Sequence, residues 1–111
     1  MTVPTEAAKR SSADNFRDLM LARCIAQAYQ KAPEVFRDAG ATASVLVDWT
    51  EYDADEGADA SDSMINRYLA RDYAHPLVEY KDRKFDLLKC IDMYHSAELS
   101  TLVRKYVSKH R

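Results

Sequence analysis

Apolar residues recur three and four positions apart along most of the 111-residue chain, which is the spacing of helices that bury one face. The first such stripe begins at Phe16 and continues through Leu19, Met20 and Cys24. It predicts a helix that ends near Gln30. Residues 14 and 15 are Asp and Asn, and either side chain can cap the start of this helix by accepting a hydrogen bond from its first turn.

A second helix is predicted from Pro33 to Tyr52. Proline suits the first turn of a helix, since the amide that it lacks has no partner there. Apolar side chains follow at helical spacing through Gly40, which weakens a helix by about 1 kcal/mol relative to alanine. A break at this glycine, giving two short helices, is the alternative. The β-branched residues around 44–47 are compatible with a strand, but no partner strand is evident.

Three further helices are predicted in the second half of the chain. The third follows a cap at Asp62 or Ser63 and ends before Pro76, because the residue before a proline avoids the helical region. The fourth carries a broad band that we expect to be buried, formed by Phe85, Leu87, Leu88, Cys90, Ile91 and Tyr94. Ser96 is expected to cap the fifth, whose apolar face holds Leu99, Leu102, Val103, Tyr106 and Val107. A single kinked helix in place of the last two is the alternative.

This pattern and the composition predict an all-α fold. Hydrophobic residues make up 47% of the chain. The chain has only two glycines and three prolines, too few for the many tight turns of a β-sandwich. We expect a compact bundle of about five helices with short loops, one of them acidic. Residues 1–13 are expected to form a flexible N-terminal leader, and residues 14–111 a single helical domain. No apolar run approaches the roughly 18 residues of a membrane span, so no membrane insertion is predicted.

Charge is strongly segregated along the chain. Between Asp38 and Asn66 there are eight acidic residues and no Lys, Arg or His, so this segment carries −8 and the remainder +6. We expect residues 53–61 to form an acidic loop whose negative field attracts a basic protein surface. A solvated loop that only keeps the protein soluble is the alternative. Trp49 and Tyr52 lie beside the acids and favour a binding role, although Trp49 could equally belong to the core.

The sequence contains no convincing catalytic or metal-binding motif. An EF-hand calcium loop counted from Asp53 needs glycine at its sixth position and glutamate at its twelfth, but Gly57 is fifth and Met64 twelfth. Cys90 and His95 are five residues apart and do not share a helix face, and the paired cysteines of zinc sites are absent. A glycine-rich phosphate loop is absent as well. We therefore predict no catalytic residues, no metal and no cofactor.

The C-terminus carries a small basic cluster, formed by Arg104, Lys105, Lys109, His110 and Arg111. These cations complement the negative end of the last predicted helix. They are few, and the formal net charge of the chain is −2, so the sequence does not predict nucleic-acid binding.

The two cysteines, Cys24 and Cys90, are 66 positions apart. A disulfide between them would close a long loop and stabilise the fold by roughly 4 kcal/mol in the chain-entropy model. Two buried, reduced thiols that behave as small apolar side chains are the alternative. The cysteine count by itself does not decide between the two.

Two segments resemble a known family. The residues NFRDLMLARCIA at 15–26 resemble the first helix of the periplasmic amidase immunity proteins of type VI secretion systems. The residues LLKCIDMYHSAEL at 87–99, which continue into LVRKY at 102–106, are similar to the closing helices of that family. The resemblance covers roughly residues 15–107. It is most specific in the second segment, where a cysteine precedes an aromatic-His-Ser helix junction.

The resemblance implies a function as well as a fold. Such proteins are small helical homodimers that protect a cell and its kin from a delivered peptidoglycan amidase. That amidase has a papain-like fold with a catalytic Cys and His, and it cuts the stem peptide between D-glutamate and diaminopimelate. The immunity protein docks a protruding helix and loop into the substrate cleft and has no catalytic residues of its own.

Carried over to this chain, the resemblance implies a periplasmic protein with a Cys24–Cys90 disulfide, because the periplasm oxidises thiols. The family's signal peptide is not visible in residues 1–10, and we expect that it has been removed. Carboxylates that mimic an acidic stem peptide place the inhibitory surface at Glu51, Tyr52, Asp53, Asp55, Glu56, Asp59 and Asp62. The alternative function is a helical adaptor or structural domain that binds another basic protein through the acidic loop.

Overall fold

The computed structural model describes residues 2–73 and 82–107, and it confirms the all-α class. Five α-helices lie within these residues: α1 (Ser12–Ala28), α2 (Pro33–Asp48), α3 (Ala54–Leu69), α4 (Asp86–Tyr94) and α5 (Ala97–Tyr106). A short 3-10 helix, Glu6–Lys9, precedes them. Among the described residues the only β-type pairing is an isolated antiparallel bridge between Tyr52 and Val107.

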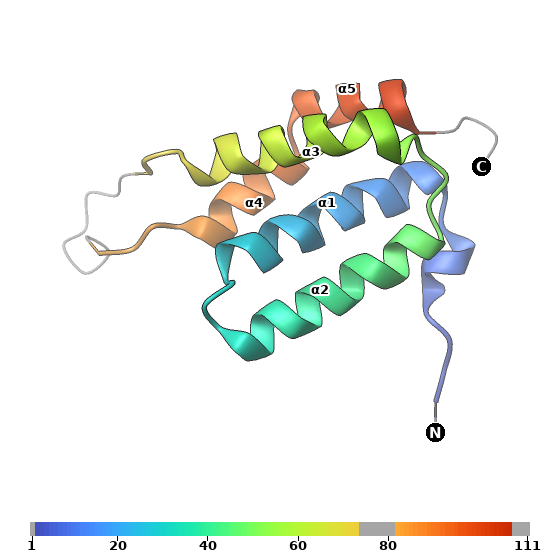
Figure 1. Cartoon of the computed structure of the whole chain (residues 1–111), viewed down its shortest axis with the longest axis horizontal. Helices are drawn as coiled ribbons and strands as arrows, with labels where there is room; N and C mark the ends of the chain where they lie inside the picture. The colour runs from blue at the N-terminus through green and yellow to red at the C-terminus, as the bar shows by residue number, and fades with distance from the viewer. Residues whose placement is uncertain (1, 74–81, 108–111) are drawn as a thin grey trace.

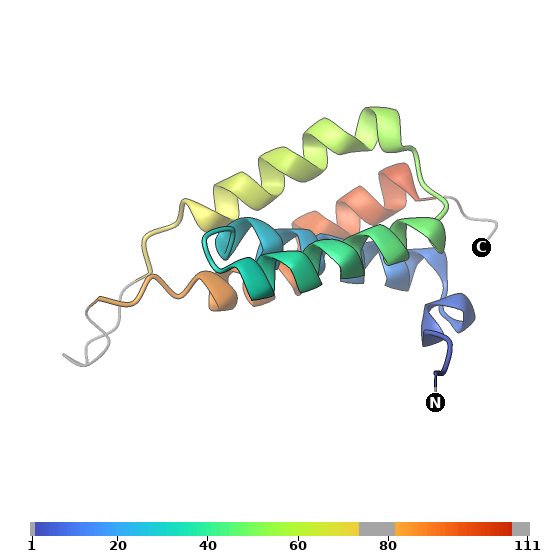
Figure 2. The same cartoon turned by 60° about the horizontal axis from the view of Figure 1, so that its bottom comes forward.

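Helix α1 is the centre of the bundle (Figures 1 and 2). It contacts all four other α-helices, most extensively α2 and then α4. Its inward face holds Phe16, Leu19, Met20 and Cys24, each essentially inaccessible to solvent. Met64 and Ile65 of α3, Cys90 and Met93 of α4, and Leu99 and Leu102 of α5 complete the core. The three-four spacing of these side chains is the reason why α1, α3 and α5 each present an apolar stripe to the bundle.

Helix α1 begins earlier than the sequence predicted. Ser11 is its N-cap, and the Ser11 hydroxyl accepts a hydrogen bond of 3.1 Å from the amide of Asp14. Asn15, which the sequence offered as a cap, is instead fully buried, and its amide group donates to the carbonyl oxygens of Ala7 (2.8 Å) and Trp49 (3.1 Å). The buried asparagine therefore connects the start of α1 to the 3-10 helix and to the end of α2.

Helix α2 is continuous through Gly40, so the predicted alternative of two short helices is wrong. The space around this glycine is open, since a Cβ atom built there meets nothing within 4 Å. The helix ends at Asp48 rather than at Tyr52. Trp49 and Tyr52 lie after its end, and both are partly buried against the core. Trp49 thus packs against the core, which is one of the two alternatives predicted from the sequence.

The predicted acidic loop at residues 53–61 is wrong, because α3 begins at Ala54 and most of that segment is helical. The Asp53 carboxylate caps the helix and accepts a hydrogen bond of 3.1 Å from the amide of Glu56. Asp55 and Glu56 in the first turn are favoured by the positive end of the helix dipole. Alanines at 54, 58 and 60 supply high helix propensity. These local preferences outweigh the glycine and the repulsion between carboxylates.

The buried band predicted for α4 is only partly correct. Cys90 and Met93 are fully buried, but Leu87, Leu88 and Ile91 are 46%, 43% and 39% exposed. The helix has nine residues, and the face that carries the disulfide and Met93 is the one turned towards α1. Side chains on its other faces therefore reach solvent.

Helices α4 and α5 are separate, so the alternative of one kinked helix is wrong. Ser96 has extended backbone angles and caps α5, its hydroxyl accepting a hydrogen bond of 3.0 Å from the amide of Leu99, as predicted. Helix α3 ends at Leu69, four residues before Tyr73. Pro76, which the sequence predicted as the stop, lies outside the described residues, as do three members of the predicted basic C-terminal cluster, Lys109, His110 and Arg111.

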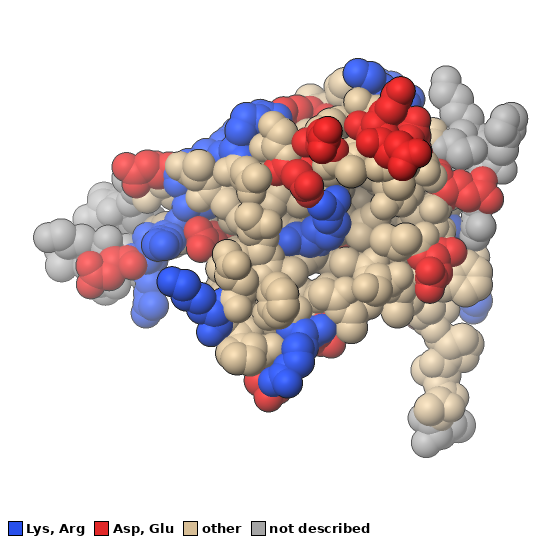
Figure 3. Space-filling view, in the orientation of Figure 1, with Lys and Arg blue, Asp and Glu red and all other residues tan. Residues whose placement is uncertain are grey.

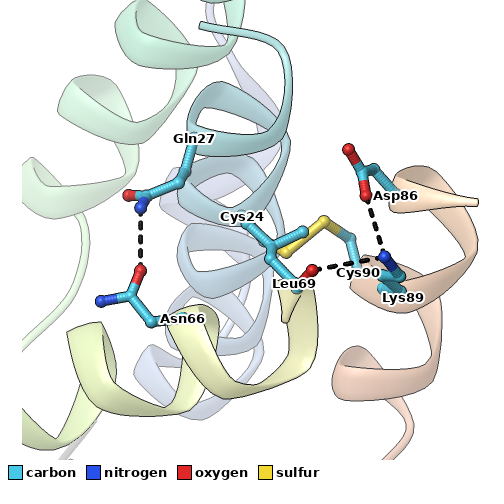
Figure 4. The surroundings of a disulfide bond; sticks show 7 residues. All are labelled: Cys24, Gln27, Asn66, Leu69, Asp86, Lys89 and Cys90. Carbon is cyan, nitrogen blue, oxygen red and sulfur yellow. Dashed lines mark hydrogen bonds and ion pairs between the residues drawn. A yellow bond between two sulfur atoms is a disulfide. The ribbon is translucent and has the colours of Figure 1, made fainter. Parts of the chain in front are cut away.

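A disulfide joins Cys24 of α1 to Cys90 of α4, which decides between the two sequence alternatives (Figure 4). The two Cα atoms are 5.7 Å apart, a separation that is normal for a disulfide. Neither cysteine is accessible to solvent. The bond connects the central helix to a helix that is too short to be stable in isolation, since isolated helices shorter than about 12 residues are marginal in water.

The double variant Cys24→Ala/Cys90→Ala is expected to lose about 4 kcal/mol of unfolding free energy, because the unfolded chain regains the entropy of a 66-residue loop. Urea unfolding followed by far-UV circular dichroism measures this loss. A midpoint within error of the unsubstituted protein would contradict it.

Candidate partner-binding surface

The acidic side chains of α3 gather over its first half (Figure 3). On a helix, positions four and seven residues apart share a face, so Asp55, Asp59 and Asp62 form one row. Glu56 lies about 100° further round the helix, next to this row. All four residues are exposed. The structure therefore presents four of the six predicted carboxylates as an ordered array on a helix.

The predicted residues have different surroundings. Asp62 forms an ion pair with Arg23 of α1, and Asp53 is occupied as the N-cap of α3. Tyr52 is partly buried, with its ring 5.3 Å from that of Phe16 in an edge-to-face contact. The exposed Glu51 has its backbone amide bound to the Ser12 hydroxyl at 2.9 Å.

Three of the predicted carboxylates are exposed and have no partner among the described residues. Asp55, Glu56 and Asp59 form no side-chain hydrogen bond or ion pair with any residue in the ranges 2–73 and 82–107. We define these three residues as the acidic face of α3.

Gly57 fixes the contact between α3 and α5 beneath the acidic face. A Cβ atom at this position would lie 3.3 Å from Cγ of the Tyr106 ring, a tighter approach than most real side-chain contacts. The amide of Asp53 also donates to the carbonyl oxygen of Tyr106 at 2.8 Å. The start of α3 is thus seated on the end of α5. Nothing in the sequence around Gly57 indicates a contact with a residue 49 positions away.

Polar contacts along α3 hold its other faces. Gln27 of α1 donates to Asn66 at 2.8 Å (Figure 4), and Arg67 pairs with Glu98 of α5. The hydrogen bond to Glu98, together with the charge of that carboxylate, raises the pKa of the Arg67 guanidinium. These groups are exposed, so each contact contributes little to stability. Their effect is to align α3 with its neighbours.

The described residues contain no group of three His, Cys, Asp or Glu side chains arranged to hold a metal ion. Cys90 is bonded to Cys24, so its sulfur is unavailable as a nucleophile in this state. His95 is exposed at the end of α4. None of the helices in the described ranges is long and apolar enough to cross a membrane.

A family model described as "Type VI secretion system (T6SS), amidase immunity protein" (Tai4) matches residues 14–103. The chain belongs to this family of immunity proteins. The match extends from the start of α1 into α5 and includes α3 with its acidic face and both cysteines.

Two solved structures are similar over nearly the whole chain. One, described as "New Type VI-secreted toxins and self-resistance proteins in Serratia marcescens", has a TM-score of 0.83 and 25% identity, covering 97% of this chain and 85% of that one. The other is the effector–immunity system Tae4/Tai4 from Salmonella typhimurium, with a TM-score of 0.82 and 26% identity, covering 96% of this chain and 100% of that one. No curated protein matches the chain.

The substitution Gly57→Val is expected to destabilise the protein by about 1–3 kcal/mol, because the added atoms overlap the Tyr106 ring. The matched control is Gly40→Val, which makes the same change in α2, where a Cβ meets open space. Thermal unfolding of both variants checks the prediction. Equal melting temperatures for the two would show that the α3–α5 contact does not require glycine.

Proposed function

We propose that this protein binds a cognate type VI secretion amidase and blocks its active-site cleft with the acidic face of α3. The observation that carries the proposal is the set of three exposed carboxylates on an ordered helix, unpaired within residues 2–73 and 82–107, in a chain that belongs to an amidase immunity family. A rigid helix loses less conformational entropy on binding than a loop does, so more of the electrostatic attraction contributes to affinity.

The chemistry of the substrate supports an acidic inhibitor. According to the family resemblance, the amidase cuts a stem peptide between D-glutamate and diaminopimelate, and a cleft for such a peptide has to accept carboxylates. Asp55, Glu56 and Asp59 supply carboxylates at helical spacing, and the remaining predicted residues, Glu51, Tyr52, Asp53 and Asp62, surround them. The protein acts as a non-catalytic inhibitor, and no step of peptide cleavage involves its own residues.

We place the protein in the periplasm. The buried Cys24–Cys90 disulfide fits an oxidising compartment, because cytosolic thiols are kept reduced. A toxin that attacks peptidoglycan acts in the same compartment, so the inhibitor would meet it there.

We also propose that the protein is a homodimer, as the resemblance implies, and that the groove between α1 and α2 forms the contact. Leu46 is the only buried residue of this 16-residue helix, whereas Val35, Phe36, Val45 and Val47 are all more than 40% exposed. Residues 39–47 carry no charge. Val35 and Val45 line a groove between α1 and α2 together with Leu21, Ile25 and Ala39. Such a groove can pair with the same groove of a second copy about a two-fold axis.

The triple variant Asp55→Lys/Glu56→Lys/Asp59→Lys is expected to weaken amidase binding by at least about tenfold, because attraction between opposite charges becomes repulsion. Asp53 is left unchanged, since it caps α3. The matched control, Glu6→Lys/Asp14→Lys/Asp72→Lys, makes the same charge change at three other exposed positions. Calorimetry at two salt concentrations measures both. Equal affinities would exclude the acidic face and favour another binding surface.

The variant Val45→Glu is expected to give a monomer without loss of fold, because Val45 is 44% exposed in the single chain. Desolvating a carboxylate in an apolar contact is unfavourable. Sedimentation equilibrium, with Val3→Glu as the control at another exposed valine, measures the oligomeric state. A dimer that persists in Val45→Glu would exclude this face.

A further inference from the structure

Lys89 of α4 is a charged residue in an unusual position. Its side chain is only 5% exposed, although a lysine ammonium normally stays in water. The ammonium donates to the carbonyl oxygen of Leu69 at 3.3 Å and to the Asp86 carboxylate at 3.2 Å (Figure 4). It also lies 5.8 Å from the centre of the Tyr73 ring. Burial of this charge is costly, so its retention calls for a role that an apolar residue would not fill.

The Leu69 carbonyl identifies that role. Leu69 is the last residue of α3, and the final carbonyl groups of a helix have no partner within it. A cation at this end also interacts favourably with the negative end of the helix dipole. Lys89, which belongs to α4, therefore caps the C-terminus of α3.

The neighbours of Lys89 make this cap rigid. The next residue, Cys90, is bonded to α1, so the backbone that carries Lys89 cannot move independently of the central helix. One turn further along α4, Asp92 accepts a hydrogen bond of 2.5 Å from the Tyr73 hydroxyl, which raises the pKa of Tyr73. Helix α4 thus holds both the last residue of α3 and the segment that leaves it.

Helix α3 is consequently fixed at both ends. At its start, Gly57 lies against Tyr106 and the amide of Asp53 donates to the Tyr106 carbonyl. At its finish, the Leu69 carbonyl is bound by Lys89. Two anchors from two different helices determine the direction of the helix axis, and with it the direction of the carboxylates between them.

We propose that Lys89 is a positioning residue for toxin recognition: by capping α3 from α4, it holds the acidic face in the orientation that the amidase cleft requires. This proposal rests on the proposed function of the acidic face. It assigns a recognition role to a residue whose charge is buried inside the bundle.

The test compares Lys89→Met, which keeps the length of the side chain but removes its charge, with Lys89→Arg, which keeps the charge. The control is Lys84→Met, the same change at an exposed lysine just before α4. Hydrogen exchange in the free protein is measured first. In Lys89→Met, the amides of Ala70 and Arg71, which are bonded to Asn66 and Tyr68 at the end of α3, should exchange about tenfold faster.

Lys89→Met alone leaves the Asp86 carboxylate without its partner, which destabilises a buried pair. Lys89→Met/Asp86→Asn, which removes both charges, is therefore measured beside it. In this double variant, exchange at residues 70 and 71 should rise while exchange in the core of α1 stays unchanged, and Lys89→Arg should keep slow exchange at residues 70 and 71. Unchanged exchange at those two amides, or an equal increase throughout the molecule, would overturn the capping role.

Affinity for the amidase is measured second, alongside the acidic-face triple variant. Lys89→Met should bind about tenfold more weakly, and Lys89→Arg and Lys84→Met should bind like the unsubstituted protein. If the triple variant loses affinity and Lys89→Met does not, the positioning role is wrong and the proposed function stands. If neither variant loses affinity, the acidic face is not the binding surface, and the positioning role is overturned with it. The exchange data then still decide whether Lys89 caps α3.

Discussion

The Cys24–Cys90 disulfide joins the central helix to the shortest α-helix of the bundle, at a point that solvent does not reach. Helix α4 contributes few side chains to the core, and three of its large apolar residues are exposed. Its place therefore depends strongly on the covalent bond. Once α4 is fixed, Lys89 is fixed beside it and can bind the end of α3. A crosslink between two helices thus also determines the position of a third.

The acidic face shows how a charge-rich segment can be helical. Carboxylates four residues apart repel one another, but by only a few tenths of a kcal/mol. An Asp cap and acidic residues in the first turn stabilise a helix by about as much as this repulsion destabilises it, or by more. Stabilisation at the start of the helix thus offsets part of the repulsion between the carboxylates. Three of these carboxylates stay unpaired among the described residues. A preorganised array of like charges is suited to a basic partner, because its field is fixed before contact.

The bundle keeps its two proposed contact surfaces apart. Helices α2 and α3 lie on either side of α1 (Figure 1), so the groove between α1 and α2 and the carboxylates of α3 belong to different parts of the surface. A contact between two copies through α2 would leave α3 accessible. The two proposed contacts therefore lie on opposite sides of the central helix and can be tested by separate mutations.

Local sequence determined most of the helices. The three-four spacing of apolar residues and the Ser96 cap place α1, α2 and α5 to within a few residues, because each signal acts over one or two turns. The acidic segment was misjudged, since its charge suggested a loop while its capping Asp53 and its alanines favoured a helix. Other features needed the tertiary structure. The proximity of Gly57 to Tyr106, the pairing of Asp62 with Arg23 and the burial of Lys89 each join residues from different helices. The sequence by itself determined where helices form and that one segment is acidic. Only the packing of the helices decided which carboxylates stay unpaired, because the pairing of a carboxylate depends on contacts between residues far apart in the chain.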